Sequence, residues 1–317
     1  MLIRRLLCCW AVSFALPAAA QLPPREISRA IDSAAALIQR HYVFAAKGES
    51  IAKHLREQHQ AGAFNNTPNW KTFDSVGTAI LRSYSQDGHL YMRYSPEKVK
   101  NLRSEQQPHG VDDFFHSPKA REHNYGFREV KVLEGNTGYI KLDEINISDE
   151  SLPVLQAAMA LVSRTRALII DLRDNGGGGS EIKPVLESYF LPGNKALLTF
   201  HSRTGDTETD STITIDPALV YKGALHILVN KKTASAAEAF AYVMQAQHRA
   251  KVTGQPSAGG ANHNVLFVVN DDVFISISEA APVLPGTQKN WEGAGVQPDY
   301  VTSPGKEMEE VLKQIAR

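Results

Sequence analysis

Apolar residues recur at helical spacing in three segments near the start of the chain. In REISRAIDSAAALIQRHYV (25–43), the apolar side chains that share one helical face are Ile27, Ile31, Ala34, Leu37 and Ile38. IAKHLREQ (51–58) and FDSVGTAILRSY (73–84) repeat the pattern, with glycine and Asn-Asn between the segments. We therefore predict a small N-terminal helical domain over residues 21–100.

The following segment, residues 101–124, is polar and has no helical or strand period. Its sequence is NLRSEQQPHGVDDFFHSPKAREHN. We predict a linker or surface loop. Such a loop could also cover a site, because long irregular segments in compact proteins are often functional.

From about Asn124 onward, short apolar strands alternate with helices. The predicted strands are 127–133, 137–145, 167–172, 196–203, 211–216, 225–230, 250–254, 264–270 and 273–280, and the predicted helices are 151–164, 181–190, 237–248 and 305–316. Continuous apolar strands such as ALIID (167–171) are typical of sheets covered on both faces. The alternation predicts an α/β domain over residues 125–317.

The first twenty residues have the pattern of a signal peptide. In MLIRRLLCCWAVSFALPAAAQ, Arg4 and Arg5 precede an apolar stretch of about 15 residues, which ends in three alanines. That stretch is shorter than the roughly 20 residues that span a bilayer. We predict cleavage after Ala20 and no stable membrane anchor afterwards, with an uncleaved anchor as the alternative.

The only cysteines, Cys8 and Cys9, lie inside this segment, so the mature chain would have no disulfide and no thiolate metal site. Export without disulfides suits a bacterial periplasm or a secreted protein. The whole chain has 34 basic and 34 acidic residues, and loss of Arg4 and Arg5 would leave a net charge of −2. This balance gives no basic field for nucleic acid.

Ser235 follows the apolar strand LHILVN and precedes the helical stretch AEAFAYVMQAQH. At a helix N-terminus, unpaired N–H groups favour developing negative charge. Ser235 could therefore be a nucleophile, with small neighbours that leave room for a substrate. It could equally be a helix cap, which is a common role for serine.

A second candidate is the glycine run in ALIIDLRDNGGGGSEI (167–182). Glycines let backbone N–H groups converge on a ligand. The run lacks the spacing and the lysine of a phosphate loop, and Asp171 and Asp174 would repel phosphate. An oxyanion hole or a peptide-binding loop fits better than a flexible turn.

Two further residues are candidates from local sequence. His89, beside the turn Asp87-Gly88, could be a base or a surface histidine, since the chain has 11 histidines. Glu292, in NWEGAGVQPD, could orient a histidine base, or could be a solvated loop acid.

Together these stretches resemble the S41 peptidase family, the carboxy-terminal processing and tricorn-type proteases. ALIIDLRDNGGGG resembles the signature strand and glycine loop, TASAAEAFAYVMQ with AKVTGQPSAGGAN the nucleophile unit, and EGAGVQPD the closing motif. QDGHL and the helical N-terminal region resemble the branch with interphotoreceptor retinoid-binding protein. The resemblance implies a ClpP/crotonase-like α/β core, without cofactor or metal, that acts on peptides or proteins.

The resemblance also implies a role for each matching residue. Ser235 would be the nucleophile, His89 the general base and Glu292 the carboxylate that supports it, while Gly177 and Ala236 would supply the oxyanion hole. Two positions depart from the family. Gly260 stands in SAGGAN where the processing proteases have a catalytic lysine, and Gly88 stands where tricorn-type sites have a serine.

Three functions follow from these residues. The first is a serine peptidase, which the set Ser235, His89 and Glu292 favours, because a pure binder needs none of the three. The second is a binding module for apolar ligands or peptides, as in the retinoid-binding relative. The third is an inactive scaffold partner. Fewer than 40 residues separate His89 from Tyr125, which leaves no room for a PDZ domain there.

Overall fold

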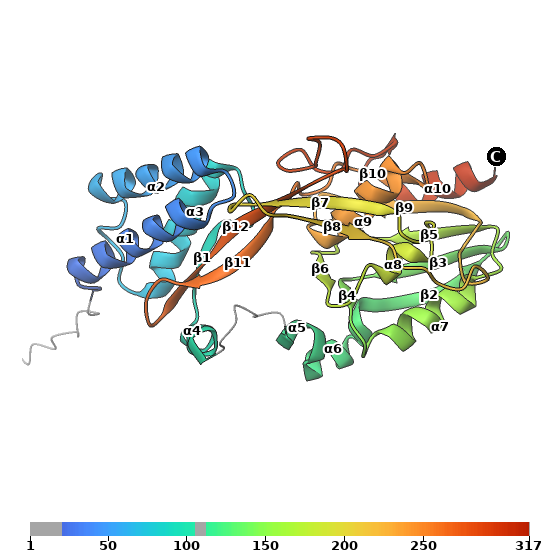
Figure 1. The fold of residues 1–317 in the computed structure, drawn as a ribbon, viewed down its shortest axis with the longest axis horizontal. Helices are drawn as coiled ribbons and strands as arrows, with labels where there is room; N and C mark the ends of the chain where they lie inside the picture. The colour runs from blue at the N-terminus through green and yellow to red at the C-terminus, as the bar shows by residue number, and fades with distance from the viewer. Residues whose placement is uncertain (1–20, 105–111, 317) are drawn as a thin grey trace, which may run out of the picture.

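The computed structural model describes residues 21–104 and 112–316 of the chain. The predicted signal peptide and both cysteines lie outside the described residues. Figure 1 shows an elongated molecule of two lobes that are joined by long strands. In the described part of the chain, no helix is both long and apolar enough to cross a bilayer.

Three amphipathic helices form much of the first lobe. They are α1 (Pro24–His41), α2 (Ala45–Gln60) and α3 (Trp70–Ser85). Ile31 and Phe73 are buried where the apolar faces meet. α3 begins at a side-chain cap, in which Asn69 Oδ1 accepts a hydrogen bond from the Thr72 N–H at 2.9 Å. The structure thus confirms the three helices that periodicity predicts.

Strands from distant parts of the chain complete this lobe. β1 (Tyr91–Tyr94) pairs antiparallel with β12 (Val273–Val283), and β12 also pairs with β11 (His263–Val268). Ile275 and Ile277 of β12 pack into the same core as α1, α2 and α3. The hydrophobic core of the helical lobe therefore contains residues from the far end of the sequence, which local periodicity cannot indicate.

β12 continues into the second lobe (Figure 1), where it pairs with β7 (Ala196–Ser202), and β7 pairs with β8 (Thr207–Ser211). The predicted strand over 211–216 is wrong, because β8 ends where that segment begins. Backbone pairing ends at Thr212, and the next N–H, that of Ile213, donates to a side chain, Ser188 Oγ, at 2.9 Å. The β8 sequence, TETDS, is too polar to be recognised as a strand.

The second lobe is built on a six-stranded sheet. Its order is β13 (Tyr300–Val301), β10 (Ala250–Gly254), β9 (Ala224–Val229), β5 (Ala167–Asp171), β3 (Thr137–Leu142) and β2 (Phe127–Leu133). All neighbours are parallel except β2 and β3. Every residue of β5 is buried, which explains its continuous apolar sequence.

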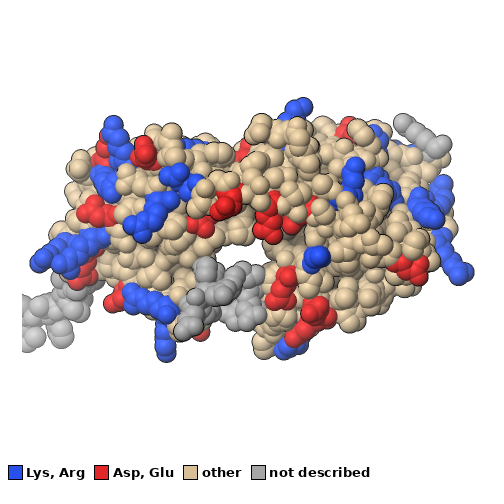
Figure 2. All heavy atoms as spheres, viewed as in Figure 1, with Lys and Arg blue, Asp and Glu red and all other residues tan. Residues whose placement is uncertain are grey.

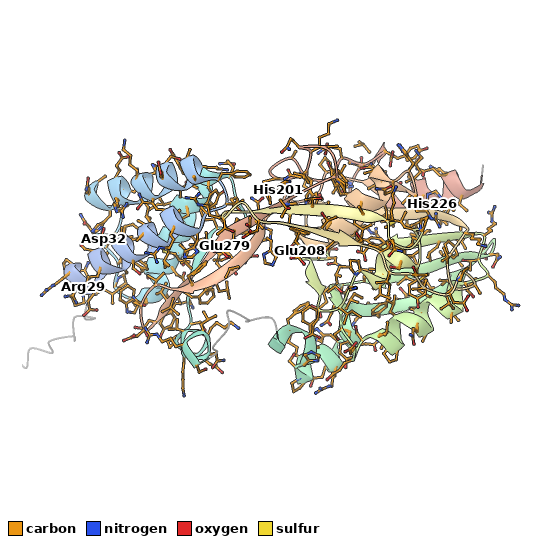
Figure 3. The ribbon with its side chains drawn as sticks, in the orientation of Figure 1. Arg29, Asp32, His201, Glu208, His226 and Glu279 are labelled. Atoms are coloured by element: carbon orange, nitrogen blue, oxygen red, sulfur yellow. The ribbon has the colours of Figure 1, made fainter. Side chains whose placement is uncertain are left out.

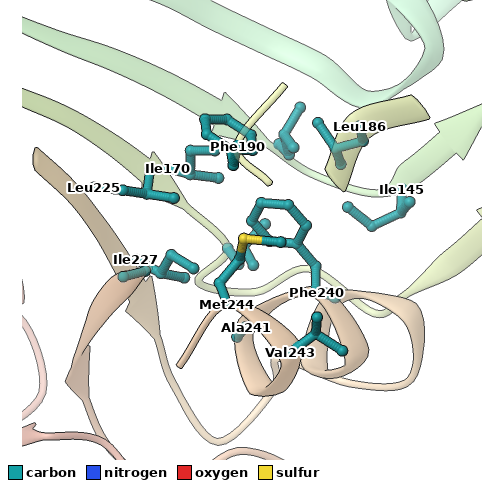
Figure 4. Close-up of a cluster of buried hydrophobic side chains, with 14 of the residues drawn as sticks. Ile145, Ile170, Leu186, Phe190, Leu225, Ile227, Phe240, Ala241, Val243 and Met244 are labelled. Carbon is teal, nitrogen blue, oxygen red and sulfur yellow. The ribbon is translucent and has the colours of Figure 1, made fainter. Parts of the chain in front are cut away.

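Helices cover both faces of this sheet. On one face, α7 (Leu152–Val162) and α9 (Ala236–Ala246) contribute to the main core, and Figure 4 shows Phe240 and Met244 of α9 facing Ile170 and Ile227 of the strands. On the other face, Val311 of α10 (Glu307–Ala316) packs in a smaller cluster. The predicted α/β core with two covered faces is confirmed.

The remaining elements are short, and they lie in two parts of the chain: residues 96–126, which connect the lobes, and residues 145–188, around the glycine loop. The helices are α4 (Pro96–Ser104), α5 (Asp112–His116), α6 (Pro118–Glu122), the 3₁₀ turn η1 (Asn124–Gly126) and α8 (Val185–Ser188), and the strands are β4 (Ile145–Ile147) and β6 (Gly178–Ser180). Most of the described part of 101–124 is thus helical, although its polarity suggests a loop. The helix predicted over 181–190 is a single turn, because Pro184 directly precedes α8.

Candidate active site

Ser235 lies in a tight turn between β9 and α9. Its backbone has φ 52° and ψ −122°, a combination that is unusual for a residue with a side chain. The turn is held by buried Thr233, whose Oγ1 donates to the Leu172 carbonyl at 2.8 Å. Such backbone strain clusters at functional sites, where it directs a side chain outward. The backbone of Ser235 thus differs from that of an ordinary N-cap residue, which typically has dihedral angles in the β region.

The glycine loop lies directly against this turn. Buried Asn175 ties the two together: its carbonyl accepts from the Ala234 N–H at 2.9 Å, and its Oδ1 accepts from the Gly177 N–H at 2.9 Å. Gly177 has φ +105°, and a Cβ added there would lie 2.7 Å from Ser235 Cβ and 3.2 Å from the Ala236 nitrogen. Only glycine fits this close approach, which brings Gly177, Ser235 and Ala236 together.

His89 reaches the same region from the first lobe, between α3 and β1. Its N–H donates to Asp87 Oδ1 at 2.8 Å, and its carbonyl accepts from Ser276 Oγ at 2.6 Å. A Cβ added to Gly260 would lie 2.9 Å from His89 Cε1. The imidazole therefore occupies the space that a side chain at position 260 would need.

Burial lowers the pKa of His89 below its ordinary value. The carboxylates of Asp87 and Glu238 oppose this effect, whereas His263 and Arg82 add to it. This lowered pKa favours the neutral form of the ring. His89 Nδ1 is buried without a hydrogen-bond partner among the described residues.

Glu292 is held by the loop that follows β10. Its Oε2 accepts from the backbone N–H groups of Ala261 at 2.7 Å and Asn262 at 3.1 Å. Its Oε1 is buried and has no partner among the described residues. Burial, and then the carboxylate of Asp87, raises the pKa of Glu292 to about 7.

A further residue, Glu238, joins these parts, and the sequence candidates did not include it. It is fully buried at the third position of α9, where its Oε2 accepts from the Ser235 N–H at 2.8 Å. The same carboxylate accepts from the N–H groups of Gly259 and Gly260. The spacing Ser-x-x-Glu, typical of a capping box, was the signal that could have identified it.

The candidate residues therefore converge from both lobes. Ser235 and Gly260 donate backbone hydrogen bonds to the same Glu238 oxygen, a Cβ at Gly260 would meet His89, and Glu292 binds the next two residues of this loop. Among the described residues, no hydrogen bond joins Ser235 Oγ to His89, or His89 to Glu292. No group of three or more His, Cys, Asp or Glu in the described ranges could hold a metal ion.

Acidic side chains border the site at the junction of the lobes. Asp210, Glu208 and Glu279 all act electrostatically on His263, which in turn acts on His89. Figure 2 shows an opening between the lobes with acidic side chains beside it, and Figure 3 labels Glu208 and Glu279 in that region. Acidic side chains thus gather at the junction between the lobes.

Comparisons with known proteins match both lobes. The model of peptidase family S41 matches residues 136–302, more than half of the chain, and the model for the N-terminal domain of peptidase S41 in eukaryotic IRBP matches residues 19–128. The chloroplastic carboxyl-terminal-processing peptidase 1 of Arabidopsis thaliana is 25% identical over 60% of this chain and 38% of its own length. The tail-specific protease of Haemophilus influenzae is 34% identical over 30% of this chain and 13% of its own length. The chain thus spans well under two thirds of these curated relatives.

Solved structures share the fold. A lipoprotein from Streptococcus agalactiae superposes with a TM-score of 0.56 at 17% identity, over 97% of this chain and 99% of its own. The tricorn protease superposes with a TM-score of 0.57 at 13% identity, over 92% of this chain and 36% of its own. The order of motifs, the mixed α/β core and the family match lead to one conclusion: this chain belongs to peptidase family S41.

Proposed function

We propose that the protein is an exported serine peptidase that hydrolyses peptide bonds through an acyl-enzyme. One observation carries the proposal. Ser235, which carries a hydroxyl, is held at positive φ at the start of α9, and the glycine loop lies against it. The His89 imidazole, whose pKa is lowered, comes from the other lobe and lies beside Glu238, the buried carboxylate that binds the Ser235 N–H. A helix cap alone requires neither the glycine loop nor the imidazole.

In this mechanism Ser235 Oγ attacks the carbonyl carbon of the scissile peptide, and His89 accepts the hydroxyl proton. The tetrahedral intermediate collapses when His89 gives that proton to the leaving amine, which leaves an acyl group on Ser235. Water then attacks the acyl group with His89 again as the base. Catalytic hydrogen bonds are often long before substrate binds, so we expect the Ser235–His89 contact to form on binding.

The N-terminus of α9 and the glycine loop would stabilise the negatively charged oxygen of the intermediate. The Ala236 N–H lies in the first turn of α9, where backbone amides lack helical partners. The Gly177 N–H donates to Asn175 Oδ1 in the free protein, so it would have to share or exchange this bond. Removal of one such donor typically costs about 10²- to 10³-fold in rate.

Glu292 would orient His89 and stabilise its protonated form. Two buried atoms without a hydrogen-bond partner among the described residues support this role. His89 Nδ1 can donate a hydrogen bond, and Glu292 Oε1 can accept one. The pair would meet directly or through one water.

Family membership supports a peptide or protein substrate, and the balanced charge of the chain argues against nucleic acid. The sequence of residues 1–20 supports export to the periplasm or the medium. Neither the proposed chemistry nor the residues around Ser235 require a cofactor.

The test is labelling with a fluorophosphonate probe, with hydrolysis of a mixed peptide library measured in parallel. We expect covalent labelling of the parent protein, and loss of both labelling and hydrolysis in Ser235→Ala. Ser163→Ala, at an exposed serine after α7, serves as a labelling control that retains the nucleophile. Equal labelling of parent and Ser235→Ala, or none in either, would contradict the proposal and favour a binding module.

A further inference from the structure

We propose that Glu238 is the positioning residue that fixes Ser235 and His89 relative to each other across the two lobes. The inference rests on the proposed peptidase function and adds a residue to it. Glu238 does not touch the reacting atoms. It acts through the backbone on both sides of the site.

The Glu238 carboxylate is fully buried and accepts four hydrogen bonds. Oε2 accepts from the N–H of Ser235 at 2.8 Å and of Gly260 at 2.9 Å. Oε1 accepts from the Gly259 N–H at 2.7 Å and from Ser257 Oγ at 2.5 Å. All the donors are N–H or O–H groups, and an ionised carboxylate is the side chain that accepts from all of them.

These bonds connect the nucleophile turn to the loop of residues 257–260. Ser257 Oγ extends the connection, since it accepts from the Val296 N–H at 2.6 Å and so reaches the segment after Glu292. Glu238 therefore joins two segments that are far apart in sequence. Loss of its acceptors would let the serine turn and this loop shift independently.

The same loop limits where the His89 ring can lie. A Cβ added to Gly260 would be 2.9 Å from His89 Cε1 and 3.6 Å from Glu238 Oε2. The imidazole and the carboxylate thus face the same small space from opposite lobes. A single buried group consequently sets the backbone of the nucleophile and one wall of the base's pocket.

The charge of Glu238 also reaches His89. The charged or titratable groups around the ring are Asp87 from its own turn, Arg82 from α3, His263 from β11 and Glu238 from α9. Glu238 and Asp87 raise the pKa of His89, against burial, His263 and Arg82. Loss of the Glu238 charge should therefore lower the pKa of His89 further.

The experiment is Glu238→Gln in the full-length protein. The amide keeps the shape but turns one acceptor into an NH₂ group that faces N–H or O–H donors. We expect the rate of fluorophosphonate labelling to fall by about 10²-fold, as small misplacements of reacting groups can do. We also expect the acid limb of the labelling profile, and the His89 ring titration followed by NMR, to shift to lower pH.

A matched control is Glu307→Gln. Glu307 is also buried near a helix start, where it accepts from the Gly305 N–H and from Gln255 Nε2, but it does not act on His89. This variant should lose stability without any shift in the His89 titration. If Glu238→Gln behaves like this control, the role is merely structural and the inference fails.

The two proposals fail in different ways. Absence of labelling in the parent would overturn the peptidase function. An unchanged His89 titration in Glu238→Gln would overturn the positioning role, whether or not the parent reacts. If Glu238→Gln does not fold, Ser257→Ala removes one bond to the carboxylate and keeps its charge, and a labelling rate equal to that of the parent would overturn the role of this network.

Discussion

At the scale of single residues, the absence of a side chain at Gly260 decides where the His89 ring can lie. The His89 ring fills the space that a side chain at this position would need, with Cε1 2.9 Å from the place of a Cβ. A side chain on the loop and the imidazole from the first lobe would thus need the same volume. Glycine on the loop makes room for the histidine.

We predict that Gly260→Ala displaces the His89 ring and lowers the labelling rate by about 10- to 100-fold. The fold should persist, because the only contact of the added methyl below 3.0 Å is with the end of the His89 side chain. The matched control is Gly88→Ala, where an added Cβ has nothing within 4 Å. Labelling rates and thermal unfolding of both variants provide the measurement. Equal rates in the two variants would contradict the prediction.

A second residue-scale prediction concerns pH. A base must be neutral and a supporting carboxylate must be ionised, so activity should rise with pH through both titrations. The pKa of His89 is lowered from its ordinary value and that of Glu292 is raised to about 7. The upper step should therefore lie near pH 7, and Glu292→Gln should remove it while lowering the maximal rate.

The same shift predicts an opposite effect on stability. Because the folded state raises the pKa of Glu292, it binds that proton more tightly than the unfolded chain does. Ionisation of Glu292 thus opposes folding. The stability that protonated Glu292 contributes at low pH is lost as the pH rises from about 4.5 to 7. At pH 8, Glu292→Gln should be at least as stable as the parent in denaturant unfolding. A clear loss of stability there would show that the charge is favourably paired.

At the scale of elements, the β9–α9 unit places the serine because both of its parts are anchored in the main core. Phe240 of α9 is 1% exposed and packs edge-on against Phe190, with ring centroids 5.8 Å apart. Figure 4 shows it among the side chains of the strands. The position of the turn therefore depends on how α9 packs against the sheet.

We predict that Phe240→Ala lowers the free energy of unfolding by about 3–5 kcal/mol, since it leaves a cavity in a packed core. Leu161→Ala on α7 is the control. Leu161 is 56% exposed, so its loss should change stability by no more than about 0.5 kcal/mol. Urea unfolding followed by circular dichroism compares the two. Similar midpoints for both variants would refute this account of the core.

Prediction of elements from sequence succeeded where burial is continuous or strongly periodic. β5 and β9 are apolar throughout, and α1 has one apolar face, so each was recognised. The polar strand β8 was missed because its partner β7, not its composition, makes it a strand. The short helices α5 and α6 were missed because five residues contain too little periodicity.

At the scale of the whole molecule, the candidate site lies where one strand passes from the first lobe into the second. β12 packs under the N-terminal helices and then pairs with β7 in the second lobe. This arrangement carries His89, from the first lobe, to the serine turn of the second. The acidic side chains at the junction (Figures 2 and 3) also lie here, on β8 and β12.

The sequence by itself determined the α/β core and the helices of the N-terminal lobe, because each depends on a pattern within a few neighbouring positions. It also supplied Ser235, Gly177 and Glu292 as candidate site residues, through motifs that resemble those of the family. Only the tertiary structure decided that His89 faces Gly260, that β11 and β12 complete the helical lobe, and that Glu238 connects the nucleophile to a distant loop. Side-chain burial and hydrogen bonds between remote segments follow from how the chain packs, and no local pattern records them.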